Sequence, residues 1–279
     1  MADGADPARG AAPAAERAAE RPVPYRGGGF RPRRIPGAGL ATFVILIALL
    51  EWGTRGGWIS ALTLPRPSDV LATFGELIES GMLWRHLAPS LSRFAVGSAM
   101  GATAGVALGL AIGLVSLARS GLAPLIAAIF PIPKIALLPL FVIWFGIGEG
   151  SKYALIALGV FTPMVVATYG AVDNVDRTLI RMGQSFGLSR LSILRKIVVP
   201  GALPGILSGL RVALAIGIIL LVAAEMLGAT HGVGAYILEA GSLYDLERLF
   251  AGVAILSALG VAVSAAVGGV ERRLLAWRT

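Results

Sequence analysis

The chain has 279 residues and a formal net charge of +8, and 56% of its residues are apolar while only 14% are charged. Its mean hydropathy is +0.79. A soluble domain of this length needs a larger share of polar residues to cover its surface, so the composition predicts an integral membrane protein. The positive residues lie at the ends of the apolar blocks and in the tails, where the membrane explains them without nucleic acid as a partner. With no cysteine and two histidines, no metal site is predicted.

Residues 1–37 are rich in Ala, Pro, Gly and Arg and have no apolar periodicity, which predicts a disordered basic tail. Residues 38–279 are predicted to form the membrane domain. Its apolar blocks are continuous rather than alternating, so an all-α membrane protein is expected and a barrel is not. We expect six membrane helices, at roughly 38–54, 90–116, 121–146, 153–172, 205–228 and 249–270.

Two connections between these spans are long and polar. Between the first and second spans, Ser68 is expected to cap a short amphipathic helix that runs from Asp69 towards Ser80. The second connection covers residues 173–204. Most Lys and Arg residues fall on one side of the membrane if the amino terminus is cytoplasmic, and membrane proteins place this excess inside. Both termini are therefore predicted to be cytoplasmic, which agrees with six spans.

The second predicted span has a regular glycine pattern. Its glycines recur at every fourth position, at Gly97, Gly101, Gly105, Gly109 and Gly113. Positions i and i+4 share a helix face, so these glycines form a groove that another helix backbone can approach closely. The groove could serve helix sliding during a functional cycle, or static packing.

The spans contain two charged residues that are candidates for a solute pathway. Lys134 lies among four prolines between residues 124 and 139, which disfavour a regular helix. It is either a pathway element that attracts an anion or a structural lysine near a helix end. Glu225 lies near the outer end of the fifth span. It could be a gate or solute contact, or it could pair with an arginine or reach the interface.

The connection at residues 173–204 has the strongest functional pattern. It predicts a short helix over about 178–186, a break at Gly187, and a second helix capped near Ser189. Pro200 and Pro204 are expected to end that second helix and to turn the chain back into the membrane.

This connection resembles the EAA loop of binding-protein-dependent importer permeases. The family pattern is E-A-A, three residues, Gly, nine residues, and then I-x-L-P. Gly187 matches the glycine, and residues 197–200, from Ile197 to Pro200, match the ending with valine in place of leucine. The E-A-A positions hold Arg181, Met182 and Gly183, so the glutamate and both alanines are missing.

A wider resemblance covers residues 60–275 and is similar to the nitrate, sulfonate and taurine branch of these permeases. It rests on the segments 64–70, 131–140, 144–148 and 203–211. The resemblance implies the fold of a type I ABC importer permease in a bacterial inner membrane. It also implies a second copy of the chain, a dimer of ATPase subunits that uses ATP and Mg, and a periplasmic solute-binding protein.

The resemblance further implies a role for the loop in ATPase coupling. The first short helix would be the coupling helix, with Met182 and Phe186 in an apolar pocket of the ATPase and arginines such as Arg181 near acidic groups. The chain itself has no phosphate-binding P-loop, so it is not expected to be an enzyme or to bind a cofactor. The solute is expected to be a small organic anion or nitrate. An ion-coupled secondary transporter is the alternative, although its usual mid-span acidic residue is not found.

Overall fold

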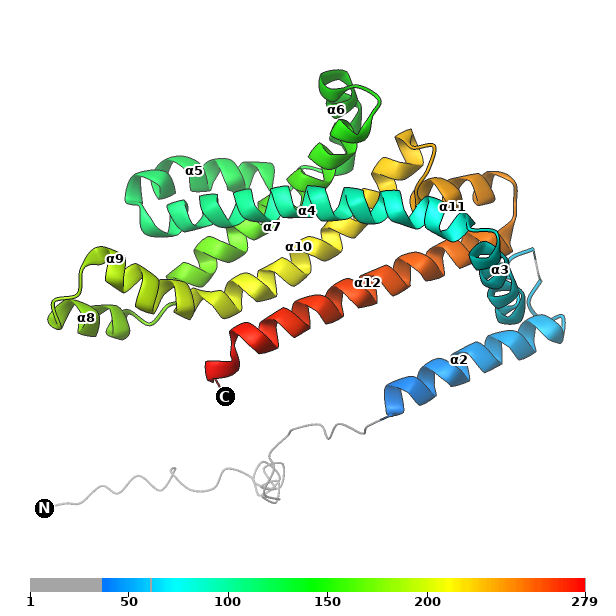
Figure 1. Ribbon diagram of the computed structural model, residues 1–279, viewed down its shortest axis with the longest axis horizontal. Helices are drawn as coiled ribbons and strands as arrows, with labels where there is room; N and C mark the ends of the chain where they lie inside the picture. Colours follow the sequence, from blue (N-terminus) through cyan, green and yellow to red (C-terminus); the bar gives the residue numbers. More distant parts are fainter. Residues whose placement is uncertain (1–36, 61, 279) are drawn as a thin grey trace, which may run out of the picture. The chain divides into compact units, whose positions relative to one another are not determined.

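The computed structural model describes residues 37–60 and 62–278, which are helical with short connections (Figure 1). The predicted tail lies outside the described residues, except for Gly37. The described chain divides within the first helix into two units, one that ends at Ile47 and one that begins at Ala48. No strand occurs in the described ranges, which confirms the all-α prediction for them.

Five helical segments in the described ranges are long and apolar enough to cross a membrane, and six are if one bent pair counts as a span. The long helices are α2 (Ala38–Arg55), α4 (Met82–Leu114), α7 (Glu149–Asp173), α10 (Val199–Gly228) and α12 (Leu246–Leu274). The bent pair comprises α5 (Ser116–Ile129) and the run of η1 (Lys134–Leu137) and α6 (Leu138–Phe145). The shorter elements are α3 (Pro67–Glu79), α8 (Arg177–Ser185), α9 (Arg190–Ile193), η2 (Leu194–Val198), α11 (Val233–Ser242) and η3 (Ala276–Arg278).

The third predicted span, 121–146, is not one continuous helix. Its two parts meet at a bend of 92° between Ile129 and Lys134. Pro131 and Pro133 lie in this break, where they supply no backbone N–H for a continuing helix. The irregular backbone that the prolines predict within this span is therefore confirmed.

Two sequence predictions are wrong. Pro200 and Pro204 do not end a helix, because both lie in the first turns of α10. The π-helical turn η2 leads directly into α10, and Pro200 lies in the first turn of α10. Ser68 does not cap α3, because the helix begins one residue earlier, at Pro67, and Arg66 is its N-cap residue. A proline at the first helical position is preorganised for that role.

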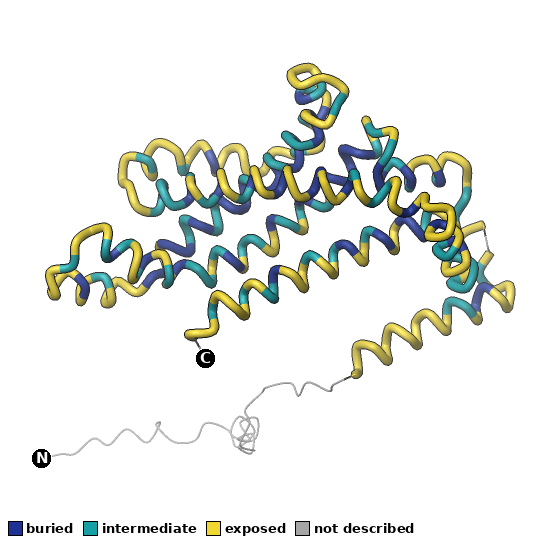
Figure 2. Tube along the Cα trace, in the orientation of Figure 1, coloured by how far each residue is buried: buried dark blue, intermediate teal, exposed yellow. Residues whose placement is uncertain are grey.

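Helix α7 is the most buried of the long helices and packs between α4 and α10 (Figure 2). The glycine face of α4 lies directly on it. A methyl group added at Gly101 would lie 2.3 Å from the carbonyl oxygen of Ala157, and one added at Gly105 would lie 2.5 Å from Cβ of Met164. On an adjoining face of α7, a methyl group added at Gly209 of α10 would lie 2.1 Å from Cβ of Ala167. The predicted close approach of helix backbones is confirmed on α4, and α10 repeats it.

The core of the second unit forms where these helices meet. Buried apolar side chains from α4, α7, α10 and α12 make one cluster, which comprises Phe94, Ile156, Val160, Met164, Ala213, Leu221 and Leu259. Within this unit, the α8–α9 connection and the α3–α11 region lie at opposite ends of the helices (Figure 1). These two ends contain the features that bear on function.

Candidate functional site

The connection between α7 and α10 folds as a helical hairpin at one end of the second unit. The carboxylate Oδ1 of Asp176 accepts the N–H of Thr178 at 2.7 Å and caps α8. This hydrogen bond lowers the pKa of Asp176 below its ordinary value. Helix α8 ends at Ser185, and Gly187, two residues further on, has a φ of +71°, in the left-handed region that glycine adopts without strain. The predicted first helix, the break and the cap at Ser189 are all confirmed.

The end of α8 is closed by two backbone hydrogen bonds. The N–H of Leu188 donates to the carbonyl of Gly183 at 3.0 Å, and the N–H of Gly187 donates to the carbonyl of Gln184 at 3.0 Å. This pair of bonds is the Schellman motif, a common way for a helix to end at a left-handed glycine. Because glycine occupies the left-handed position, the chain can reverse between α8 and α9 within a few residues.

Helix α8 presents apolar side chains on an otherwise polar surface. Phe186 is 80% exposed, and Leu179 and Met182 are each 50% exposed. Arg181 is exposed on the same short helix. Large apolar side chains gathered on one face of a short helix indicate a surface that a partner covers. Met182, Phe186 and Arg181 are residues for which the family resemblance implies partner contact, whereas Leu179 was not predicted.

The other face of α8 rests on the second half of the hairpin. Gly183 is buried, and a methyl group there would lie 2.9 Å from Cδ1 of Ile197 and 3.4 Å from Cγ1 of Ile193. Ile197 is half-buried and belongs to the apolar cluster beneath the loop, and Pro200 is half-buried at the start of α10. Gly183 and Ile197 therefore pack together inside the hairpin.

Lys134 lies at the bend between α5 and η1. Its Nζ donates to the carbonyl oxygen of Phe130, at the C-terminal end of α5, and lies 5.2 Å from the centre of the Phe130 ring. A cation at this position interacts favourably with the unpaired carbonyl groups and the negative dipole end of α5. These contacts correspond to the structural alternative for Lys134.

At the opposite end of the second unit, an ion network around the buried Arg93 and Glu225 and the half-exposed Glu149 joins four helices. Arg93 of α4 makes two hydrogen bonds to the carboxylate of Glu149 of α7, at 2.6 and 2.7 Å. Its Nη1 also donates to Oε1 of Glu225 of α10 at 2.8 Å. The side chain of Arg93 is 5% exposed and that of Glu225 is fully buried. Glu225 therefore pairs with an arginine, one of the alternatives left open by the sequence.

The remaining lone pairs of Glu225 are also satisfied. The Ser90 hydroxyl donates to Oε1 at 2.7 Å, and the N–H of Gly234 donates to Oε2 at 2.9 Å. Nη1 of Arg93 also donates to the carbonyl oxygen of His231 at 2.6 Å. The network therefore holds the loop between α10 and α11 against α4, and a fully bonded carboxylate can remain buried.

Sequence reasoning missed Arg93, although a signal was present. Arg93 falls inside the predicted span 90–116, and an arginine within a membrane helix requires a partner. Glu149 and Glu225 are acidic residues near the outer ends of the fourth and fifth predicted spans. Pairing charges across span ends would have suggested the contact, but not that both carboxylates bind the same guanidinium.

Together, several apolar spans, close glycine-mediated helix packing and a capped helical hairpin with an exposed apolar face define a multi-pass helical membrane protein. The family model for the inner membrane component of binding-protein-dependent transport systems matches residues 101–276. The chain belongs to this family. It is a permease subunit of an ABC transporter and a multi-pass protein of the inner membrane.

Relatives at the sequence level are permeases of the same kind. The chain is 38% identical over 245 residues to the taurine transport system permease protein TauC of Escherichia coli (strain K12), which covers 85% of this chain and 89% of the relative. It is 35% identical over 242 residues to the putative aliphatic sulfonates transport permease protein SsuC of Bacillus subtilis (strain 168), with 86% and 87% covered. It is also 35% identical over 243 residues to the riboflavin transport system permease protein RibX of Chloroflexus aurantiacus, with 87% and 91% covered.

A solved structure shares the fold. The inward-facing MetNI methionine ABC transporter, in its CY5 native crystal form, aligns with a TM-score of 0.61 at 20% identity, over 70% of this chain and 98% of that chain. Its selenomethionine-soaked crystal form gives a TM-score of 0.60 at 21% identity, over 69% and 95%. The fold is therefore that of an ABC importer permease. In such transporters the permease is the pore subunit and the ATPase is a separate subunit.

Proposed function

We propose that this chain forms half of the pore of an ATP-driven importer and that α8 transmits the state of an ATPase subunit to the membrane helices. The observation that carries the proposal is the α8–α9 hairpin. It presents Leu179, Met182 and Phe186 outward, while Gly183 and Ile197 fix its inner face. Because the inner face of the hairpin is packed, α8 and its exposed apolar side chains can move together with α10 as one rigid body.

The proposal includes six spans, with the bent α5–α6 pair counted as one, and both termini in the cytoplasm. The distribution of Lys and Arg supports this orientation, because membrane proteins concentrate these residues on the cytoplasmic side. It places α8 in the cytoplasm and the α3–α11 end outside. The basic residues 1–37 would then form a cytoplasmic tail, and 173–204 would form the coupling loop of the membrane domain.

The assembly that we propose contains two copies of this chain, two ATPase subunits and a periplasmic solute-binding protein. ATP with Mg would be bound and hydrolysed by the ATPase subunits, and this chain would bind no cofactor. Binding of ATP would favour one of two pore states by its differential affinity, and so drive alternating access. No observation here favours an ion-coupled secondary transporter.

The solute that we propose is a small organic anion such as a sulfonate or taurine. The names of the relatives support this class, although one relative is named for riboflavin. Lys134 remains a candidate pathway residue because it lies at the bend of a broken span, where irregular backbone must face protein or water. Glu225 is a weaker pathway candidate, because its carboxylate is fully buried and bonded.

The proposal is tested by co-expressing the chain with a candidate ATPase subunit and purifying the complex in lipid nanodiscs. Phe186→Ala removes the most exposed side chain at the end of α8 and is expected to lower recovery of the ATPase several-fold. Leu117→Ala is the matched control, because Leu117 is 83% exposed at the start of α5 and is outside the hairpin. Equal loss with both variants, or transport that follows an ion gradient without any ATPase, would exclude the coupling role.

A second variant tests the transmission step. Gly187→Pro fixes φ near −65°, which is incompatible with the observed +71°. We expect a complex that still hydrolyses ATP but no longer responds to solute-loaded binding protein. A normal response in this variant would show that the geometry of the α8–α9 turn is not needed for coupling.

A further inference from the structure

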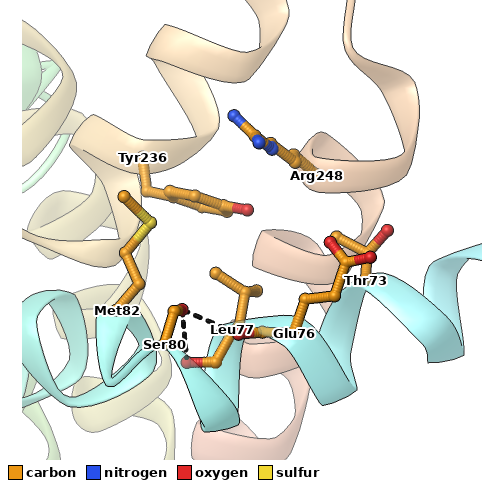
Figure 3. Close-up of a pocket in the computed structure, with 7 residues that line it drawn as sticks. All are labelled: Thr73, Glu76, Leu77, Ser80, Met82, Tyr236 and Arg248. Atoms are coloured by element: carbon orange, nitrogen blue, oxygen red, sulfur yellow. Dashed lines mark hydrogen bonds between the residues drawn. The ribbon is translucent and has the colours of Figure 1, made fainter.

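The end of the second unit opposite α8 contains three neighbouring hollows between α3 and the α11–α12 turn. The first has a volume of about 270 Å³ and lies between Thr73, Leu77 and Met82 on one side and Tyr236 and Arg248 on the other (Figure 3). The second, of about 290 Å³, shares Thr73, Glu76 and Arg248 with the first. The third shares Asp69, Asp245 and Glu247 with the second and extends the groove to Tyr244.

The first hollow contains a buried hydroxyl with no partner. Tyr236 is 6% exposed, and its hydroxyl oxygen makes no hydrogen bond within the described residues. The hydroxyl points into the space between Arg248 and Leu77 (Figure 3). Burial raises the pKa of the Tyr236 phenol, so it stays neutral and can both donate and accept a hydrogen bond. A buried polar group without a partner indicates that something outside this chain supplies one.

The charges along the groove indicate what kind of chemical group would bind there beside the Tyr236 hydroxyl. The four carboxylates that line the three hollows are Asp69, Glu76, Asp245 and Glu247. They outnumber the two lining guanidinium groups, those of Arg66 and Arg248, and Nε of Arg248 lies 3.3 Å from Oδ2 of Asp245. The groove is therefore net acidic and favours a cation. Leu77, Met82 and the Tyr236 ring form an apolar wall beside Glu76, which suits an aliphatic stem that ends in a cation.

An exposed aromatic side chain is held beside the same groove. Tyr244 is 89% exposed and has a φ of +57°, a left-handed conformation that glycine usually occupies after a helix. A tyrosine at this position is disfavoured locally, and such residues are typical of functional surfaces. Exposed tyrosines often anchor protein interfaces. This combination favours a protein partner over a small solute.

From these observations we propose that the groove is a docking site for a basic side chain, lysine or arginine, of the soluble solute-binding protein. The aliphatic stem lies on Leu77, Met82 and Tyr236. The cationic group binds the Glu76 carboxylate and donates to the Tyr236 hydroxyl. The proposal rests on the importer function and on its orientation, in which α3 and α11 face outward. The net acidic groove does not suit an anionic solute, so the site serves the carrier protein and not its cargo.

The test uses the full chain in nanodiscs with ¹³C-labelled methionine methyl groups, because Met82 lies in the hollow and Met182 lies at the opposite end of the unit. The probe is Nα-acetyl-lysine methylamide, and the neutral comparison is Nα-acetyl-norleucine methylamide, which keeps the stem and lacks the cation. We expect the lysine probe to shift the Met82 resonance saturably and to leave Met182 unchanged. The norleucine probe is expected to bind about two- to fivefold more weakly, the range that one partly exposed ion pair gives.

Variants assign the effect to named groups. Glu76→Gln and Tyr236→Phe are each expected to weaken lysine binding several-fold, while the Met182 resonance reports that the fold is intact. Glu79→Gln is the matched control, because Glu79 is an exposed carboxylate of α3 that lines none of these hollows. Equal binding of both probes, or equal losses with Glu76→Gln and Glu79→Gln, overturns the site.

Two further outcomes separate this proposal from the importer function. Taurine is expected to leave the Met82 resonance unchanged, and a saturable shift with taurine would show a solute site and overturn the docking assignment. If the ATPase co-purifies with the chain but the lysine probe does not bind, the docking site is wrong and the importer function stands. If the chain binds the lysine probe but no ATPase co-purifies with it, the importer function is wrong. The groove then binds a cation, but its occupant is not a solute-binding protein.

Discussion

Nη1 of Arg93 and Oε1 of Glu225 lie 2.8 Å apart, between side chains that are 5% and 0% exposed. The two residues are 132 positions apart in the chain. Their pair closes a network that includes Glu149 and the carbonyl oxygen of His231, and so ties α4, α7, α10 and the α10–α11 loop at one end of the unit. If these helices rearrange at this end, either the hydrogen bonds of the network break or the helices move together with the network intact.

Removing the arginine is expected to be strongly destabilising. Arg93→Met keeps an unbranched stem but leaves the Glu225 carboxylate buried without its cation, which typically costs about 3–5 kcal/mol. The measurement is thermal unfolding of the purified chain in a mild detergent. Arg211→Met is the control, because Arg211 pairs with Glu271 across partly exposed side chains and should change stability by about 1 kcal/mol or less. Similar melting temperatures for the two variants would argue against the network as a structural tie.

The contact between α4 and α7 should tolerate no added side chain. In Gly101→Ala the new methyl group would meet the Ala157 carbonyl oxygen at 2.3 Å, so the two helices must separate. We expect a loss of about 1–3 kcal/mol in the free energy of unfolding. Gly170→Ala in α7 is the control, because the added methyl group meets nothing within 4 Å and alanine favours the helix by roughly 0.5–1 kcal/mol. A loss in both variants would mean that helix packing does not decide the effect.

Two glycines with close neighbours should respond differently to alanine. In Gly183→Ala the nearest atom, at 2.9 Å, is Cδ1 of Ile197, the free end of a flexible side chain. In Gly209→Ala it is Cβ of Ala167, at 2.1 Å, which cannot move without its helix. We therefore expect Gly183→Ala to change the unfolding free energy by less than about 1 kcal/mol and Gly209→Ala to lower it by about 1–3 kcal/mol. Thermal unfolding of the two variants side by side measures the difference.

The cap of α8 should depend on pH. Because a hydrogen bond from Thr178 lowers the folded pKa of Asp176, the stabilisation is present above the unfolded value of 3.8 and is lost as the pH falls through the lower folded value. Asp176→Ala should speed hydrogen exchange of the α8 amides at neutral pH, whereas Asp176→Asn keeps a capping oxygen and should exchange slowly. Slow exchange in the alanine variant would show that tertiary packing alone holds α8.

A substitution at the bend separates the two roles considered for Lys134. Lys134→Met removes the donor to the Phe130 carbonyl and also removes the charge, whereas Lys134→Arg keeps both. If Lys134 attracts an anionic solute, uptake by Lys134→Met shows a higher KM with an unchanged melting temperature. If it only caps α5, the melting temperature falls and the KM is unchanged. Uptake and unfolding assays on the same preparation distinguish these results.

The sequence predicted several features of the permease that depend on residues close to one another in the chain. It indicated the apolar spans, because a helix in lipid satisfies its own backbone hydrogen bonds and needs only a long enough apolar run. It also indicated the α8–α9 hairpin, since a left-handed glycine at 187 and a cap at Ser189 act within a few residues, although it did not indicate the cap at Asp176. The recurring glycines of α4 marked a packing face for the same reason.

Tertiary structure alone decided which elements these features meet. The sequence did not indicate that the glycine face of α4 packs on α7. It also did not indicate that Glu225 pairs with Arg93, or that the Tyr236 hydroxyl lies in the groove beside α3. The 92° bend after Ile129 and the continuation of α10 through Pro200 were also decided there, because a proline permits either a break or a helix start. Contacts between distant segments depend on how whole helices pack, and one sequence specifies each helix more directly than it specifies the neighbours of that helix.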